Sequence, residues 1–437
     1  MSLRLRSVLL GLCLVTGAGY AADESLVSFQ LPNGMRVVLA PQAGVEAACV
    51  MVYHRFGVAD DPADLRGATH LFQNLMFNGT EHVEPYDHQL LIDRSGGSTT
   101  TRVGYDNAVF ADTVSSEEVP LALWLAAERL RSLRLDNSLI ERAKAQSAAR
   151  LARLAEVSPI YRAQTWIHAQ LFAGTPYEMP LGGDPAKVRQ FRPERIRDTY
   201  RRFQNPADIL LVVAGKFDLA QLRQGIGKNF QDLPGGRPSP QPLRPLPDLF
   251  TKANVQNWLV EGLAQPFLVV GFRFPYRQSP EYTPALVLAH YLVDARVSRL
   301  QAAMDSAGVA VTVSGSLTEY LGGNGLVIQL VADRRIELER AKYVLQHVLA
   351  SLAQNPISQR ELTELRNLME LDYYRNWAVP EGRCLEIALQ VHLTGDLPGE
   401  KGDGGRFRRV DHYDLVRIAQ KYLKWNQRVQ LNVLPDR

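Results

Sequence analysis

A long internal repeat constrains the fold of this chain more than any other feature of its sequence. The stretch LRSLRLDNSLIERAKAQ, which begins at Leu130, matches in pattern LASLAQNPISQRELTEL, which begins at Leu349. In the same way IRDTYRRFQNPADILLVV, from Ile196, matches VRIAQKYLKWNQRVQLNVL, from Val416. A period of about 220 residues is far longer than the unit of a solenoid, so the pattern indicates that one domain has been duplicated.

A proline-rich segment separates the two copies. Residues 235–248 read GGRPSPQPLRPLPD, with five prolines in fourteen residues. Proline interrupts a helix and does not fit the interior of a sheet. We therefore expect a linker at 235–248, an N-terminal domain at 22–234 and a C-terminal domain at 249–437.

Each copy carries the signals of strands and of amphipathic helices. In the first half GMRVVLAP, AACVMVYHRFG and AVFADTV are rich in β-branched residues and are bounded by turn residues, which is typical of strands. Helices are expected near 66–77, from 119 onward and at 138–156. The prediction is an α+β protein with two homologous halves, each a two-layer unit in which helices cover a mainly antiparallel sheet.

The first 21 residues have the layout of a secretory signal peptide. Arg4 and Arg6 precede an apolar run from Val8 to Val15, and small residues follow up to Ala21. The apolar run is too short for a permanent membrane helix, and no later stretch approaches the length of about 18 apolar residues that a span needs. We expect cleavage after Ala21 and a periplasmic or secreted mature chain without a membrane span.

The cysteines and the charge balance give further expectations. A lipoprotein would use Cys13, but Leu12 is bulky where such sites want a small residue. The mature chain keeps Cys49 and Cys384, each in apolar surroundings, so we expect buried free thiols rather than a disulfide. Cleavage removes two arginines and no acidic residue, which takes the formal net charge from +3 to +1. Nothing in that balance indicates a nucleic-acid partner.

The stretch GATHLFQNLMFNGTEHV, residues 67–83, contains part of a metal-binding pattern. In a helix, residues i and i+4 share a face, so His70 and Asn74 point the same way, with Gln73 close by. The zinc-peptidase arrangement H-x-x-E-H uses this geometry: two imidazoles bind zinc, and the glutamate deprotonates the bound water. Gln73 has no ionisable carboxylate, and the amide of Asn74 is a poor zinc ligand. The pattern therefore predicts that the base and one ligand are missing.

The surroundings of this motif resemble the pitrilysin-type (insulinase-like) zinc metallopeptidases along nearly the whole mature chain. The similarity runs, in order, through LPNGMRVVLAP, GATHLFQNLMFNGTEHVEP, GGSTTTRVGYDNAVF, GTPYEMPLGGD, QPFLVVGFRFP and VSRLQAAMDSAGV. It implies the duplicated fold of that family, and it implies zinc as the cofactor of the active relatives.

The resemblance also implies a third metal ligand, a glutamate seven residues after another glutamate in an E-R-x5-E pattern. Here Glu141 and Arg142 are present, but the seventh position is Ala148. Glu156, the nearest carboxylate downstream, is two turns out of place. Glu141 is therefore interpreted as a relic without a catalytic role.

The substrate region of the family has diverged as well. Its N-A-x-T run is replaced by TTRV from Thr100, although Asp106 is kept, and both residues are possible remnants of that region. In the second half, family members often carry an arginine and a tyrosine that reach the substrate. The matching stretch here runs from Asp305 to Val311, with a valine near the tyrosine position.

These losses predict a catalytically inactive homologue with no metal ion. By the resemblance, the chain would be the non-catalytic subunit that pairs with an active zinc peptidase and helps to enclose or bind peptide substrates. One alternative is an active zinc-dependent metalloendopeptidase whose ligands the alignment misses; His82 and His88 are the candidates for a replacement site, although a loop pair beside acids is usually solvated surface. The other alternative is a stand-alone peptide-binding protein.

Overall fold

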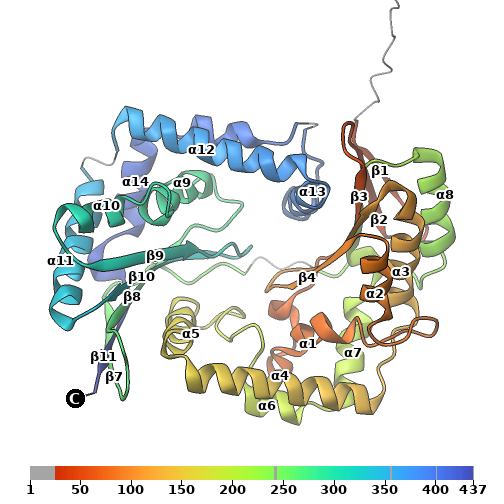
Figure 1. The fold of residues 1–437 in the computed structure, drawn as a ribbon, viewed down its shortest axis with the longest axis horizontal. Coiled ribbons are helices and arrows are strands. Elements are labelled where there is room, and N and C mark those ends of the chain that lie inside the picture. The colour runs from red at the N-terminus through yellow and green to blue at the C-terminus, as the bar shows by residue number, and fades with distance from the viewer. Residues whose placement is uncertain (1–24, 241–243, 355–356, 400, 437) are drawn as a thin grey trace, which may run out of the picture.

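The computed structural model describes residues 25–240, 244–354, 357–399 and 401–436. The predicted signal peptide lies outside these described residues. Two β-sheets lie side by side, one built before the proline-rich segment and one after it (Figure 1). Among the described residues, none of the helices is long and apolar enough to cross a membrane.

The two sheets share one topology over five strands, and β1 is an additional edge strand of the first sheet. The first sheet has the order β1-β2-β6-β3-β5-β4, and the second has the order β7-β11-β8-β10-β9. In each sheet the last strand of the half lies parallel to an early one, β6 to β2 and β11 to β7, and the other neighbours are antiparallel. The strands are β1 (Val27–Gln30), β2 (Arg36–Pro41), β3 (Ala47–His54), β4 (Ser98–Val103), β5 (Ala108–Ser115), β6 (Ile209–Gly215), β7 (Asn254–Val260), β8 (Phe267–Phe274), β9 (Val311–Leu317), β10 (Asn324–Ala332) and β11 (Val429–Pro435).

Six helices of each half follow the same order, and α6 and α8 are additions of the first half. Those of the first half are α1 (Ala68–Leu75), α2 (Asp87–Arg94), α3 (Val119–Arg131), α4 (Asn137–Val157), α5 (Pro159–Leu171), α6 (Pro185–Gln190), α7 (Pro193–Phe203) and α8 (Leu219–Phe230). Those of the second half are α9 (Tyr282–Val293), α10 (Arg299–Ser306), α11 (Arg335–Leu352), α12 (Gln359–Ala378), α13 (Pro380–Thr394) and α14 (His412–Tyr422). Short 3-10 turns are η1 (Val58–Asp60), η2 (Ala63–Leu65), η3 (Ser116–Glu118), η4 (Pro206–Asp208), η5 (Gly404–Arg409) and η6 (Trp425–Gln427).

Local sequence sets where several of these helices begin. Pro159 and Pro380 occupy the first positions of α5 and α13, where the missing N–H costs no helical hydrogen bond. Ser358 and Glu361 form a capping box at the start of α12, each side chain accepting a backbone N–H of the other residue. Helices α5 and α13 thus begin at equivalent signals, whereas α4, the counterpart of α12, has no side-chain cap.

The two halves exchange one helix each. Helix α13 of the second half packs on β3 and β6 of the first sheet, whereas α5 of the first half packs on β8 and β11 of the second sheet. In Figure 1, α3 and α8 lie on the other side of the first sheet from α13. The apolar core therefore runs across the boundary: Met51 and Val212 of the first half are buried in one cluster with Ile387 and Val391 of α13. Separating the halves would expose both of these apolar surfaces to water.

The predicted α+β fold with two homologous halves is confirmed. The expected strands correspond to β2, β3 and β5, and the expected helices near 66–77 and 138–156 correspond to α1 and α4. The described residues of the proline-rich segment, 235–240 and 244–248, form neither helix nor strand. The exchange of α5 and α13, which covers the second face of each sheet, was not predicted by the repeat.

Candidate functional site

Helix α1, which carries the incomplete metal motif, is fixed at its N-terminus by a buried carboxylate. Asp61 accepts hydrogen bonds from the backbone N–H groups of Gly67 and Thr69 and from the Thr69 hydroxyl. Gly67 has a positive φ of 99°, and an added Cβ would meet the backbone of Gly182 at 2.7 Å. Burial raises the pKa of Asp61 to about 7, against the lowering effect of those hydrogen bonds. The start of α1 is therefore determined by a tight turn that only glycine fits.

The three motif positions lie on α1 as the spacing predicted, but only one of them is a metal-binding side chain. His70 and Gln73 are half-buried, and Asn74 is exposed. Burial, helped by the positive charge of Arg150, lowers the pKa of His70 to about 4. The imidazole is therefore neutral at neutral pH, which is the form that binds metal ions. Neither amide beside it provides the second strong ligand that zinc requires.

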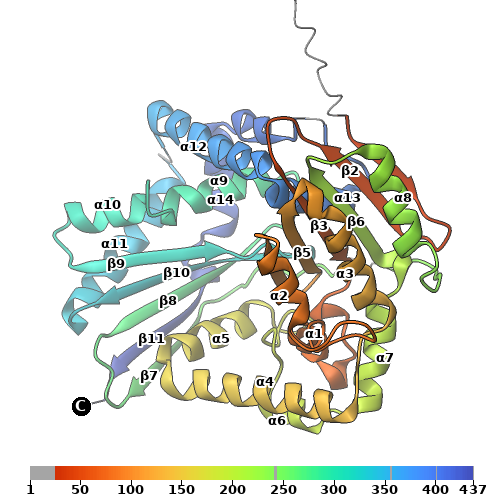
Figure 2. The ribbon, with the colours of Figure 1, turned by 45° about the vertical axis from the view of Figure 1, so that its right-hand side comes forward.

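The neighbouring helix α4 supplies no third ligand. It packs against α1 and passes beneath both α1 and α5 (Figure 2). Ala148 is fully buried and offers only a methyl group. The carboxylate of Glu141 binds the Nζ of Lys144, with Nζ to Oε1 at 2.7 Å and Nζ to Oε2 at 2.9 Å. The Lys144 side chain is only 4% exposed, so a lysine of the same helix already neutralises Glu141.

These residues do not fit a zinc ion. In the part of the chain that the structure describes, no group of three or more His, Cys, Asp or Glu side chains is arranged to hold a metal. The candidate replacement ligands bind two different acids: His82 lies 3.0 Å from Glu128, and His88 lies 3.0 Å from Asp112. The motif positions provide one imidazole, two amide groups and one methyl group. These groups support no reaction step that needs a bound metal ion.

His88 belongs to a buried polar cluster that the sequence did not indicate. Asp112 on β5 accepts hydrogen bonds from His88, from the Thr99 hydroxyl at 2.7 Å and from the Arg129 guanidinium at 3.3 Å. Burial raises the pKa of Asp112, but the positive charge of Arg129 and the bond to His88 outweigh it, and the net shift is downward. The cluster joins α2, α3, β4 and β5 through the Asp112 carboxylate, which indicates a structural role, although one guanidinium nitrogen of Arg129 has no hydrogen-bond partner.

The two expected remnants of the substrate region lie in different surroundings. Thr100 is half-buried on β4, a strand that pairs only with β5 and so forms an edge of the first sheet. Asp106 is buried, and it accepts hydrogen bonds from the Tyr177 hydroxyl and from the backbone N–H of Leu321 in the second half. Burial raises the pKa of Asp106 to about 6. Asp106 thus joins the two halves, whereas Thr100 lies on an open sheet edge.

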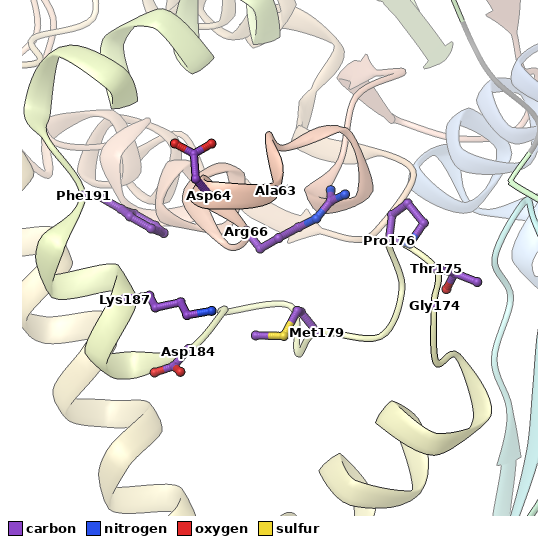
Figure 3. Close-up of a pocket in the computed structure, with 10 residues that line it drawn as sticks. All are labelled: Ala63, Asp64, Arg66, Gly174, Thr175, Pro176, Met179, Asp184, Lys187 and Phe191. Carbon is purple, nitrogen blue, oxygen red and sulfur yellow. The ribbon is translucent and has the colours of Figure 1, made fainter.

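A hollow of about 410 Å³ lies beside the N-terminal end of α1 (Figure 3). It is formed by the η2 turn, the 174–179 loop and α6, and none of the motif positions lines it. Its walls carry both signs of charge, from Asp64, Arg66, Asp184 and Lys187. This balance of charges gives no preference for an anionic or a cationic ligand.

Fold and site together define a duplicated α+β chain of the metallopeptidase kind in which the metal motif is incomplete. The model of insulinase (peptidase family M16) matches residues 36–184, and the model of the peptidase M16 inactive domain matches residues 190–369. The chain belongs to the pitrilysin/insulinase (M16) peptidase family.

Several relatives carry names that bear on function. The chain is 24% identical over 340 residues to an uncharacterized zinc protease of Mycobacterium leprae, covering 76% of this chain and 74% of that protein. It is 23% identical over 216 residues to an uncharacterized zinc protease of Streptomyces coelicolor, covering 49% of this chain and 47% of that protein. The chain thus spans about half the length of the latter relative.

Solved structures share the fold at low sequence identity. A protease from Helicobacter pylori has a TM-score of 0.87 and 19% identity, covering 94% of this chain and all of that one. The periplasmic protease PqqL from Escherichia coli has a TM-score of 0.76 and 16% identity, covering 94% of this chain but 48% of that one. The described fold of this chain therefore corresponds to about half of PqqL.

Proposed function

We propose that this chain is a catalytically inactive member of the insulinase family that acts as the non-catalytic subunit of a two-chain peptidase. The observation that carries the proposal is the packed pair of helices α1 and α4. Of the positions that the resemblance assigns to the metal and its base, only His70 keeps its chemistry, while Gln73, Asn74 and Ala148 have lost it. Glu141 keeps its carboxylate but is bound by Lys144.

The match to PqqL supports pairing with a second unit of the same kind. The matched part is 48% of PqqL, so an assembly of that size contains two such units. One metal ion is enough for one enclosed active site. A complex of one chain with a complete metal motif and one chain without it is therefore sufficient for catalysis. The predicted signal peptide, together with the periplasmic location of PqqL, supports a periplasmic site of action.

Peptide contacts are proposed at the open sheet edges. Strands β4 and β9 each pair on one side only, with β5 and with β10. An extended peptide can add to such an edge through backbone hydrogen bonds, which need no catalytic side chain. The chain could thus hold substrate for the catalytic partner without taking part in the chemistry.

The first test is the zinc content of the mature chain, purified without a metal-binding tag and dialysed against trace zinc. We expect zinc near zero and no chelator-sensitive peptide cleavage by the chain alone. About one zinc per chain, together with such cleavage, would show an active metalloendopeptidase and overturn the proposal.

The second test concerns the partner. A gene next to this one that encodes a chain with intact H-x-x-E-H and E-R-x5-E patterns is the candidate, and the two chains would be expressed together. We expect a complex with a peptidase activity that the partner alone lacks. Peptide binding by this chain in isolation, with no complex and no gain in activity, would instead support the stand-alone binding protein.

A further inference from the structure

The two cysteines of the described chain meet at the contact between the halves. Cys49 lies on β3 of the first sheet, and Cys384 lies on α13, the helix that the second half contributes to that sheet. Both side chains are 0% exposed and belong to the same apolar cluster, and in the structure both are free thiols, as the sequence predicted. The Sγ of Cys384 is 3.6 Å from the backbone oxygen of Cys49 and 3.5 Å from that of Val212. Residues 335 positions apart in sequence thus place their side chains in one small region of the core.

The surroundings of Cys384, including Cys49, change the pKa of its thiol. Burial raises the pKa of the Cys384 thiol, and its interaction with Cys49 raises it further. A thiol whose pKa is raised remains protonated at neutral pH, so it is neither an activated nucleophile nor a ready metal ligand. The remaining chemistry of two neighbouring thiols is oxidation to a disulfide.

The duplicated fold supplies a comparison at the equivalent contact. Counted from the strand ends His54 and Phe274, Cys49 corresponds to Val269 on β8. Counted from the prolines that begin α13 and α5, Cys384 corresponds to Ala163. Val269 and Ala163 are both fully buried in the cluster that α5 forms with the second sheet. The second sheet and its exchanged helix thus pack with a valine and an alanine at the counted positions, without thiols.

We infer that Cys49 and Cys384 form a disulfide that fastens α13 to the first sheet, and with it one half of the chain to the other, when the protein folds in an oxidising compartment. The two thiols lose two protons and two electrons, and one S–S bond forms. The oxidant is a low-molecular-weight disulfide such as oxidised glutathione, whose own S–S bond takes up the two electrons and two protons and breaks into two thiols. Because both sulfur atoms are buried, the exchange takes place during folding or while α13 is detached.

The experiment uses the mature chain, from which Cys13 has been removed with the signal peptide. The chain is refolded with oxidised glutathione, unfolded in denaturant without reductant, and treated with a maleimide. We expect no maleimide adduct and a mass lower by two hydrogens than that of the reduced chain. Two reactive thiols in a correctly folded oxidised sample would overturn the inference.

Thermal unfolding provides the second readout. A cross-link over a long loop restricts the unfolded chain, so we expect the oxidised chain to melt about 3 °C or more above the reduced chain. The control is the double variant Cys49→Val/Cys384→Ala, which copies the equivalent pair of the other half and is expected to fold. Its melting temperature should be the same with and without reductant. An equal difference in this variant would show that the effect has another origin and would contradict the inference.

Discussion

The two halves differ most at the helix that follows their central strand. Helix α9 of the second half is almost entirely enclosed, with nine of its twelve residues buried. Helix α1 buries Ala68, Thr69 and one apolar face but leaves His70, Gln73 and Asn74 partly or fully accessible. Because the same topology forms around an apolar α9, the polar positions of α1 are not needed for folding. This comparison supports the proposal that they are what is left of a metal site.

A second difference lies in the cores. In the first half, Asp112 on β5 binds Arg129 on α3. Counted from the ends of β3 and β8, the β-sheet register places Ile328 on β10 at the position of Asp112, and the repeat places Val348 on α11 at that of Arg129; both side chains are buried in the apolar core. One half thus holds an ion pair where the other holds two apolar side chains. The duplicated fold is compatible with either solution.

Restoring the metal motif should produce the largest effect. The triple variant Gln73→Glu, Asn74→His and Ala148→Glu adds a base and two ligands around His70, which is already neutral. We expect the zinc content to rise from near zero toward one ion per chain. A micromolar dissociation constant corresponds to a binding free energy of about 8 kcal/mol. The readout is the metal content after dialysis, with circular dichroism as a check of folding.

Adding His70→Ala to this triple variant gives the matched control, which should lose the zinc again. If the well-folded triple variant takes up no more zinc than the parent, Ala148 does not occupy the third-ligand position. Peptidase activity is not expected to return together with zinc, because the Thr100 region has diverged as well.

Breaking the buried ion pair should have the next largest effect. Arg129→Val leaves the Asp112 carboxylate buried without its cation, and we expect a loss of about 3 to 5 kcal/mol in the free energy of unfolding. The double variant Asp112→Ile/Arg129→Val copies the second half and leaves no unpaired carboxylate or guanidinium, so it should lose less, although His88 and Thr99 lose their acceptor. Urea denaturation measures both, and an equal or larger loss in the double variant would argue against this reading of the comparison.

The sequence predicted local structure better than the way in which the halves meet. The strands β2, β3 and β5 were located from β-branched residues between turn residues, and the helix α4 was located from its periodicity, since a helix shows its buried face in its own pattern. The pattern of α13 shows an apolar face as well, but it cannot show that this face covers the sheet of the other half. The exchange of α5 and α13, and the meeting of Cys49 with Cys384, could therefore be found only in three dimensions.

The candidate site shows the same limit. Helical spacing predicted that His70, Gln73 and Asn74 lie on one helix, and in the structure all three lie on α1. Lys144 was overlooked, although a lysine three residues after Glu141 is a spacing at which helical side chains pair. The Asp112 cluster gave no local signal, because its members come from four separate elements of the chain.

Folding stability at low pH tests the comparison between the residues at the ends of β3 and β8. His54 stacks on Phe203 at a centroid distance of 4.0 Å, and the equivalent Phe274 packs on Tyr422 at 5.8 Å. Burial lowers the pKa of His54 from 6.5 to about 3. As the pH falls below 6.5, the unfolded chain takes up a proton before the folded chain does, so folding stability is lost between those two values. At His54, the folding stability lost between pH 7 and pH 5 is about 2 kcal/mol.

His54→Phe copies the second half and should reduce this loss. Its stability at pH 7 is expected to fall slightly, because the hydrogen bond to the Phe203 carbonyl is removed. The quantity to compare is therefore the change in unfolding free energy between pH 7 and pH 5 in each protein. If the change in unfolding free energy between pH 7 and pH 5 is the same in both proteins, other buried histidines account for all of the stability lost in acid.

The smallest effect is expected at Glu141, and it distinguishes a relic from a working residue. The Glu141 side chain is 53% exposed, so its ion pair with Lys144 is partly screened by water, and Glu141→Gln should cost about 1 kcal/mol or less. Lys144→Met removes the buried ammonium that needs this partner, so adding Glu141→Gln to it should cost less than Glu141→Gln alone. A double-mutant cycle measures this coupling. If Glu141 serves only Lys144, the same substitution in the complex with the active subunit leaves peptide cleavage unchanged, whereas a clear fall in cleavage with normal stability would assign Glu141 to the chemistry after all.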